Sequence, residues 1–134
     1  MNLSKALATA LFVAMTGCGS NYVMSTSPGV PGAEGTVVPS RSDQGNTEVE
    51  LTVKHLPPPE KIASGAKVFV VWVQPADGKA SPNNVGALKV DEDHKGKLKT
   101  MTPFKSFNLF VTPEDSGEAT APSGQKVLWT SVSE

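Results

Sequence analysis

The sequence predicts an all-β fold, a small antiparallel β-sandwich of about seven short strands. In several short segments apolar residues alternate with polar ones, which is the period of a half-buried strand. From residue 36 onward, no stretch sustains the 3.6-residue apolar period of a helix. The 134 residues include 12 Gly and 11 Pro, many of them where strands would end.

The first strands are expected between residues 36 and 74. Residues 36–38 form a short strand that ends at Pro39. Residues 47–54 alternate cleanly, so that every second side chain is apolar. Residues 67–74 are apolar on both faces and rich in β-branched side chains, which predicts a central strand. We expect Trp72 of this strand to be the chief filler of the core.

The second half of the chain continues the same pattern. A single helical turn is expected at residues 60–64, and polar turns separate further strands at residues 85–90, 97–101, 106–112 and 125–132. Seven such strands within about 100 residues, without disulfides, are typical of an immunoglobulin- or fibronectin-type sandwich. A closed barrel is the alternative architecture.

Charge and composition exclude several functional classes. The net charge is −1, so the chain has no overall attraction for nucleic acid. One cysteine and two histidines cannot form a disulfide framework, and they are too few for a protein-built zinc or blue-copper site.

Residues 1–17 are predicted to be a lipoprotein signal peptide. Lys5 precedes an uncharged stretch, residues 6–15, which is too short to span a bilayer and has the length of a secretory signal. Met15, Thr16 and Gly17 then precede the only cysteine. This arrangement resembles the lipobox of bacterial lipoproteins, in which signal peptidase recognises the three small or apolar residues.

The lipobox resemblance implies that Cys18 carries a covalent lipid and becomes the new N-terminus. That lipid would be the only bound group, and it would attach the protein to a membrane. Gly19 stands where an inner-membrane retention signal would place Asp, so the resemblance implies an outer-membrane lipoprotein facing the periplasm or the surface. An ordinary signal peptide with an incidental cysteine is the alternative.

Residues 18–35 are expected to be the lipidated cysteine and a flexible tether, and residues 36–134 the sandwich domain. The stretch 20–35 is rich in Ser, Gly and Pro and has no hydrophobic period. Fully extended, it would reach at most about 50 Å. Tyr22, Val23 and Met24 are its only bulky residues, and we interpret them as a disordered apolar triplet; insertion into the lipid headgroup region is the alternative.

A second resemblance rests on the order of several short motifs: Phe69-Val-Val-Trp72, Gly86-x-Leu88, Val111-Thr112-x-Glu114 and Pro122-x-Gly124. Over residues 35–124 this order resembles the extracytoplasmic sandwich of the anti-sigma-K-factor group. The resemblance implies the sandwich alone, because the cytoplasmic sigma-binding segment and the transmembrane helix of that group have no counterpart here. A sensory accessory of an envelope-stress system remains an alternative function.

The candidate chemical sites match known motifs poorly. Residues 91–96 begin like a calcium loop, but Lys95 and Thr102 occupy ligand positions, so a solvated hairpin turn is expected. Glu114 and Asp115 also fall in a predicted turn, where acidic residues favour solubility. The mature chain has no Gly-x-Ser-x-Gly elbow. We therefore expect no catalysis, with an unrecognised periplasmic enzyme as the lesser alternative.

The candidate interaction surface consists of aromatic and basic residues: Trp72, Trp129, Lys89, Lys95, Lys97 and Lys99. Trp72 belongs to it only if its side of strand 67–74 is the one that faces out. The lysines could contact lipid phosphates or an anionic envelope polymer, or they could protect an edge strand from self-pairing. One apolar face of strand 67–74 must also be covered, by the linker, by the loop at residues 57–59 or by a partner. Cover from within the chain is favoured. The sequence thus predicts a lipid-anchored binding or structural module whose partner is an envelope protein or polymer, not nucleic acid.

Overall fold

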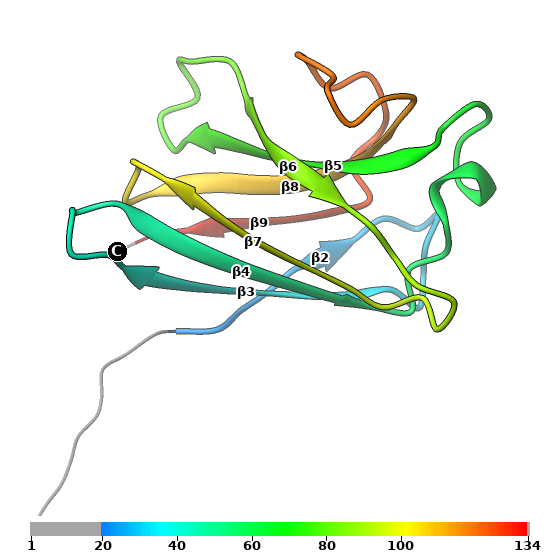
Figure 1. Ribbon diagram of the computed structural model, residues 1–134, viewed down its shortest axis with the longest axis horizontal. Helices are drawn as coiled ribbons and strands as arrows, with labels where there is room; N and C mark the ends of the chain where they lie inside the picture. The colour runs from blue at the N-terminus through cyan, green and yellow to red at the C-terminus, as the bar shows by residue number, and fades with distance from the viewer. Residues whose placement is uncertain (1–19, 134) are drawn as a thin grey trace, which may run out of the picture.

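Two antiparallel sheets stack face to face in the computed structural model, which describes residues 20–133 (Figure 1). The predicted all-β sandwich is confirmed. The signal peptide, the recognition residues Met15, Thr16 and Gly17, and the lipidation site Cys18 lie outside the described residues.

Four strands form the first sheet and five the second. The first sheet has the order β1 (Tyr22–Val23), β3 (Glu34–Arg41), β4 (Thr47–Lys54) and β7 (Gly96–Thr102). The second has the order β2 (Ser25–Thr26), β9 (Leu128–Val132), β8 (Phe107–Glu114), β5 (Val68–Pro75) and β6 (Asn83–Leu88). A 3₁₀ turn, η1 (Pro59–Lys61), lies close to the predicted helical turn. The seven longer strands of the described chain are divided three and four between the two sheets.

Strand β3 is longer than predicted, because it continues through Pro39 to Arg41. The neighbouring β1 pairs only with Thr36 and Val37. Pro39 therefore lies on an open edge of β3, where a missing N–H is tolerated.

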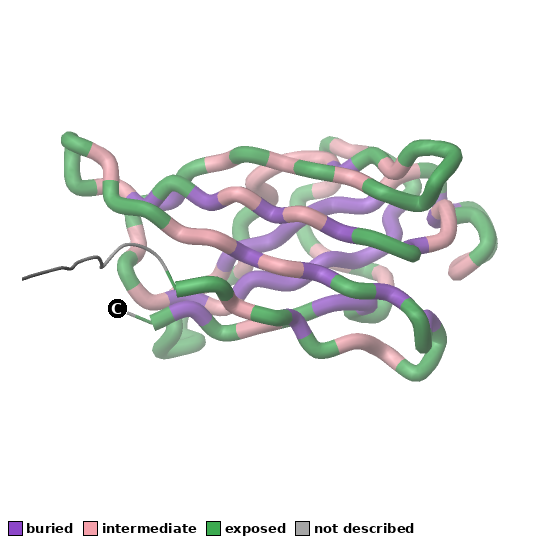
Figure 2. The backbone as a smooth tube through the Cα atoms, turned by 90° about the horizontal axis from the view of Figure 1, so that it is seen from below, coloured by how far each residue is buried: buried purple, intermediate pink, exposed green. Residues whose placement is uncertain are grey.

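The core lies between the sheets and is filled by every second side chain of the strands, the ones that point inward. Val49, Leu51 and Val53 of β4 are buried, as their period of two predicts. They face inward residues of the second sheet, such as Val71 and Val111, which pair with each other across β5 and β8. Buried backbone accordingly runs through the middle of the molecule in Figure 2.

The prediction of a flexible tether is wrong for the described residues before residue 35. Strand β1 pairs with β3 in the first sheet and β2 pairs with β9 in the second, so the segment bridges the two sheets. Met24, Val30 and Ala33 are buried in the core. All three belong to the main core cluster although their spacing has no strand or helix period, and composition alone cannot reveal such contacts.

Trp72 does not fill the core between the sheets, and it is not an exposed interaction residue. Together with Val70 and Phe110 it forms a second buried cluster, separate from the main core. Its exposure is 0%. In β5 it alternates with the core residues Val71 and Val73, so it lies on the outer face of the second sheet.

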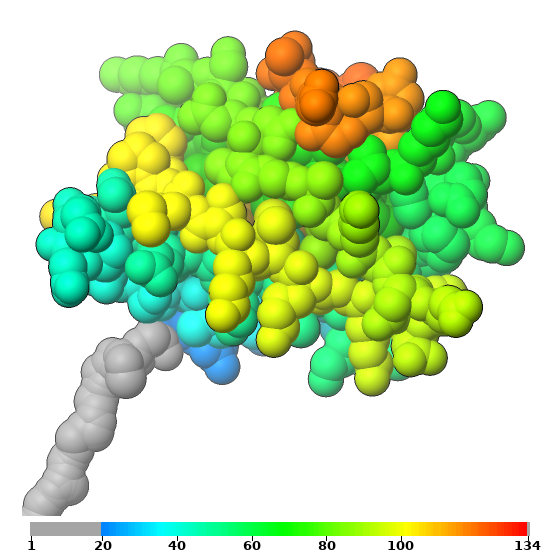
Figure 3. Space-filling model, in the orientation of Figure 1, coloured from blue at the N-terminus to red at the C-terminus, as the bar shows by residue number. Residues whose placement is uncertain are grey.

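The cover over Trp72 is the loop between β8 and β9, drawn in orange in Figures 1 and 3. The side-chain amide of Asn84 donates hydrogen bonds of 2.9 Å to the carbonyls of Gly117 and Ala119, and these bonds fix the loop. Cover from within the chain is therefore confirmed. The residue of this loop that packs on the cluster is Ala119, and Val68 of β5 packs beside it.

Candidate functional site

The most extensive polar cluster surrounds Glu114, the last residue of β8, which is buried rather than exposed in a turn. The Ser123 hydroxyl donates to Oε1 at 2.6 Å, and the Thr112 hydroxyl donates to Oε2 at 2.6 Å. The backbone N–H groups of Ser123 and Gly124 also donate to Oε2, at 2.9 and 3.2 Å. Four donors therefore surround one carboxylate.

These donors set the protonation state of Glu114. Burial raises the pKa of the carboxyl group, but the hydrogen bonds from Ser123, Thr112 and Gly124 outweigh burial and hold the pKa below its ordinary value. The group is thus an ionised carboxylate at neutral pH whose lone pairs are occupied. It is poorly suited to act as a general base.

The cluster extends to Trp72 and holds the covering loop in place. The Trp72 indole N–H donates to the Thr112 hydroxyl oxygen at 2.8 Å, and that hydroxyl donates to Glu114. A Cβ at Gly124 would come within 2.2 Å of the Pro113 carbonyl oxygen, so only glycine fits there. Trp72, Thr112, Glu114 and Gly124 all belong to the motifs that carry the anti-sigma-K resemblance. Their shared contacts make them structural residues.

Trp129 is the exposed end of an aromatic row across the outer face of the second sheet. Trp72 pairs with Phe110, and Phe110 pairs with Trp129. The first two are buried, whereas Trp129 is 37% exposed. Lys126 places its ammonium 4.4 Å from the centre of the Phe110 ring, and Gln125, Lys126 and Trp129 line an open hollow of about 430 Å³.

Uncharged polar residues continue this surface beside Trp129. Asn108 pairs with Ser131 of β9, and the Ser131 hydroxyl donates to the Asn108 side-chain oxygen at 2.7 Å. Gln74 of β5 pairs with Asn108 on the other side. An aromatic ring beside amide and hydroxyl groups combines apolar contact area with directional hydrogen bonding, a frequent composition of binding surfaces.

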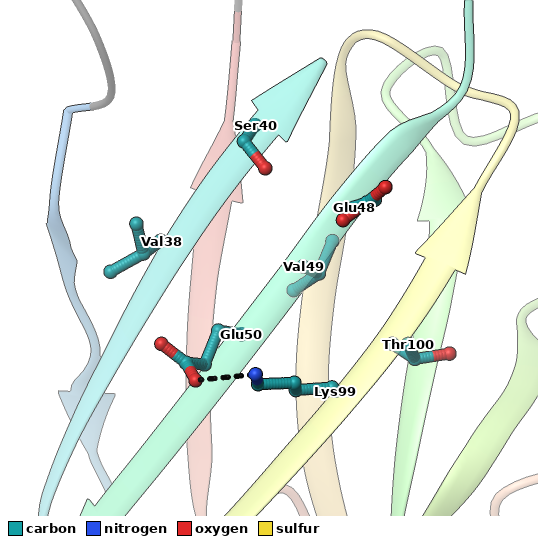
Figure 4. A pocket seen from close by; sticks show the side chains of 7 residues that line it. All are labelled: Val38, Ser40, Glu48, Val49, Glu50, Lys99 and Thr100. Atoms are coloured by element: carbon teal, nitrogen blue, oxygen red, sulfur yellow. Dashed lines mark ion pairs between the residues drawn. The ribbon is translucent and has the colours of Figure 1, made fainter. Parts of the chain in front are cut away.

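Lys97 and Lys99 lie on the outer face of β7, an edge strand of the first sheet. Both ammonium groups are 3.8 Å from the same Glu50 oxygen. Figure 4 shows Lys99 and Glu50 beside a shallow hollow of about 200 Å³. Their place on an edge agrees with the interpretation that lysines protect this strand from self-pairing.

Lys89 and Lys95 are exposed in the connection between β6 and β7, which forms part of the front surface in Figure 3. Three acidic residues, 91–93, lie between them. The four candidate lysines therefore do not form a purely basic patch.

The connection between β6 and β7 is a tight turn, in agreement with the turn predicted for residues 91–96. The Asp91 carboxylate accepts the N–H groups of Asp93 and Lys95 at 2.8 and 3.0 Å. The Asp91 carboxylate therefore stabilises the turn by accepting hydrogen bonds from its backbone. Among residues 20–133, no three His, Cys, Asp or Glu side chains are grouped so that they could hold a metal ion.

No family model, no curated protein and no solved structure matches this chain. Within the described part of the chain, no helix is both long and apolar enough to cross a membrane.

Proposed function

We propose that this chain is a lipid-anchored cell-envelope protein that acts as a non-catalytic binding or structural module. The sequence Met15-Thr16-Gly17-Cys18 supports the lipid anchor. The sandwich supplies a rigid scaffold, and the partner is an envelope protein or polymer. The anti-sigma-K resemblance concerns how the sandwich is built, because its motifs include residues of the Glu114 cluster: Trp72, Thr112, Glu114 and Gly124.

The observation that carries the binding proposal is the exposure of Trp129 beside two buried aromatic neighbours. A tryptophan held rigidly by a sheet loses little conformational freedom on binding, and tryptophan is enriched at binding hot spots. The hollow beside it and the uncharged row of Asn108 and Ser131 extend the contact area. Trp129 is therefore the residue through which we expect a partner to bind.

Photo-crosslinking in intact cells tests this role. A photoreactive amino acid replaces Trp129 in one variant and Glu48, an exposed residue on the outer face of the other sheet, in a control variant. We expect a discrete adduct only from position 129. Protease and glycan-hydrolase digestion of the adduct then distinguishes a protein partner from a polymer. Equal adducts from both positions, or none from position 129, would refute the proposed surface.

The anchor has its own test. Cys18→Ala removes the thiol that would carry the lipid, so the protein should move from the membrane fraction to the soluble fraction. Unchanged membrane fractionation of Cys18→Ala would show that another feature holds the protein there.

A further inference from the structure

The chain joins the sandwich almost immediately after Cys18. Ser20 is the first described residue, and Tyr22 and Val23 already pair with β3. The Tyr22 hydroxyl donates to the carbonyl of Ser133 at 2.6 Å, which ties the start of the domain to its end. The segment that could act as a flexible tether is therefore much shorter than its composition suggests.

Chain geometry limits how far a lipid on Cys18 could lie from the sandwich. Two peptide units separate Cys18 from Ser20, a span of at most about 7 Å, and the span to Tyr22 is on the order of 14 Å. The flexible tether expected from the sequence would have reached about 50 Å. A lipid at this position would hold the domain directly at the bilayer surface.

The direction of β1 selects the part of the sandwich nearest the lipid. Because β1 is antiparallel to β3, its N-terminal end points toward the Arg41 end of β3. The β3–β4 hairpin, residues 42–46, lies at that end (Figure 1). The β6–β7 connection lies at the opposite end, where Gly96 pairs with Val53. Strand residues advance about 3.3 Å each, so the two ends of β3 are on the order of 23 Å apart.

Two exposed apolar side chains lie on the first sheet, to which β1 belongs: Val23 on β1 itself and Met101 on β7, the strand at the opposite edge. Of the three large hydrophobic residues that are exposed in the described chain, Val23 and Met101 are on the first sheet, with exposures of 79% and 47%. Val23 pairs with Thr36, and Met101 pairs with Glu48, close to the β3–β4 hairpin. Neither belongs to the core, and both suit contact with a lipid interface.

Resting on the lipid anchor proposed above, we infer that the β1 edge and the β3–β4 hairpin of the sandwich lie against the bilayer that holds Cys18. The β6–β7 connection, with Lys89 and Lys95, then points away from that bilayer. This orientation directs those two lysines toward a partner beyond the membrane surface and away from the lipid phosphates of the anchoring membrane.

Fluorescence quenching in vesicles tests the orientation. Asp43→Cys labels the β3–β4 hairpin and Asp93→Cys labels the β6–β7 connection; both residues are exposed aspartates in turns. Each variant is expressed with its signal peptide, purified from membranes and labelled with a thiol-reactive dye, since a lipid thioether leaves Cys18 unreactive. In phosphatidylcholine–phosphatidylglycerol vesicles containing spin-labelled lipid, we expect quenching at position 43 to be several-fold stronger than at position 93.

A variant with a longer segment between Cys18 and the sandwich provides the control. Insertion of about 20 Gly and Ser residues between Ser20 and Asn21 lets the domain move tens of ångströms from the bilayer, so the difference between the two labels should disappear. Intact mass reports separately whether Cys18 carries acyl chains. A lipidated protein with equal quenching at both positions overturns the orientation alone. A chain without lipid overturns the proposed anchor and the orientation with it.

Discussion

Replacement of Glu114 by Gln tests whether the buried carboxylate holds the β8–β9 loop over Trp72. Glutamine keeps the shape but offers one acceptor oxygen, and its amide nitrogen would face the Ser123 or Thr112 hydroxyl. A hydrogen bond to a charged group contributes about 1.5–3 kcal/mol, and a buried donor left unpaired costs about 1–3 kcal/mol. With four donors converging on Glu114, we expect Glu114→Gln to lower the free energy of unfolding by about 2–4 kcal/mol at neutral pH.

The effect should depend on pH in a defined direction. The folded-state pKa of Glu114 is depressed. The stabilisation from its ionised form is therefore present above the unfolded-state pKa, about 4.3, and is lost as the pH falls through the folded-state pKa. Glu114→Gln lacks this contribution, so the stability gap between wild type and variant should narrow as the pH is lowered from 7 toward the acid range.

Urea unfolding followed by tryptophan fluorescence measures this gap at each pH, on soluble protein made with Cys18→Ser. Asp115→Asn serves as the matched control, because Asp115 is the neighbouring carboxylate and is exposed; its effect should stay within about 0.5 kcal/mol. A Glu114→Gln protein as stable as wild type, or a stability gap that does not change with pH, would show that the cluster does not hold the loop.

Three further substitutions, at Asn84, Gly35 and Lys99, probe other contacts, with Gly32→Ala as a control for the glycine. Asn84→Ala removes the two hydrogen bonds that hold the covering loop, so stability should fall by about 1–3 kcal/mol and acrylamide should quench the buried tryptophan more strongly. Gly35→Ala would place a Cβ 2.7 Å from the buried Met24 sulfur, whereas a Cβ at Gly32 meets nothing within 4 Å. Gly35→Ala should therefore lower the free energy of unfolding by about 1–3 kcal/mol, seen as a lower thermal midpoint. Gly32→Ala should leave the thermal midpoint unchanged. Lys99→Ala breaks only an exposed ion pair, and chemical denaturation should show a change below about 1 kcal/mol.

Alternating side chains were sufficient to predict β4 from the sequence. Its period of two separates a buried face from a polar one, and a shift by one residue would expose Val49, Leu51 and Val53 together. The tight turn at residues 91–96 followed from residue types that satisfy their own backbone. These features depend on local chemistry, which the sequence contains directly.

The sequence by itself determined the fold class, the seven longer strands and a lone cysteine in a lipobox-like context. Only the tertiary structure decided which face Trp72 takes, because β5 is apolar on both faces and periodicity cannot say which one meets the other sheet. It also decided that residues 22–26 join both sheets and that Glu114 is buried. Each of these depends on contacts between residues far apart in the chain, which composition and local period do not encode.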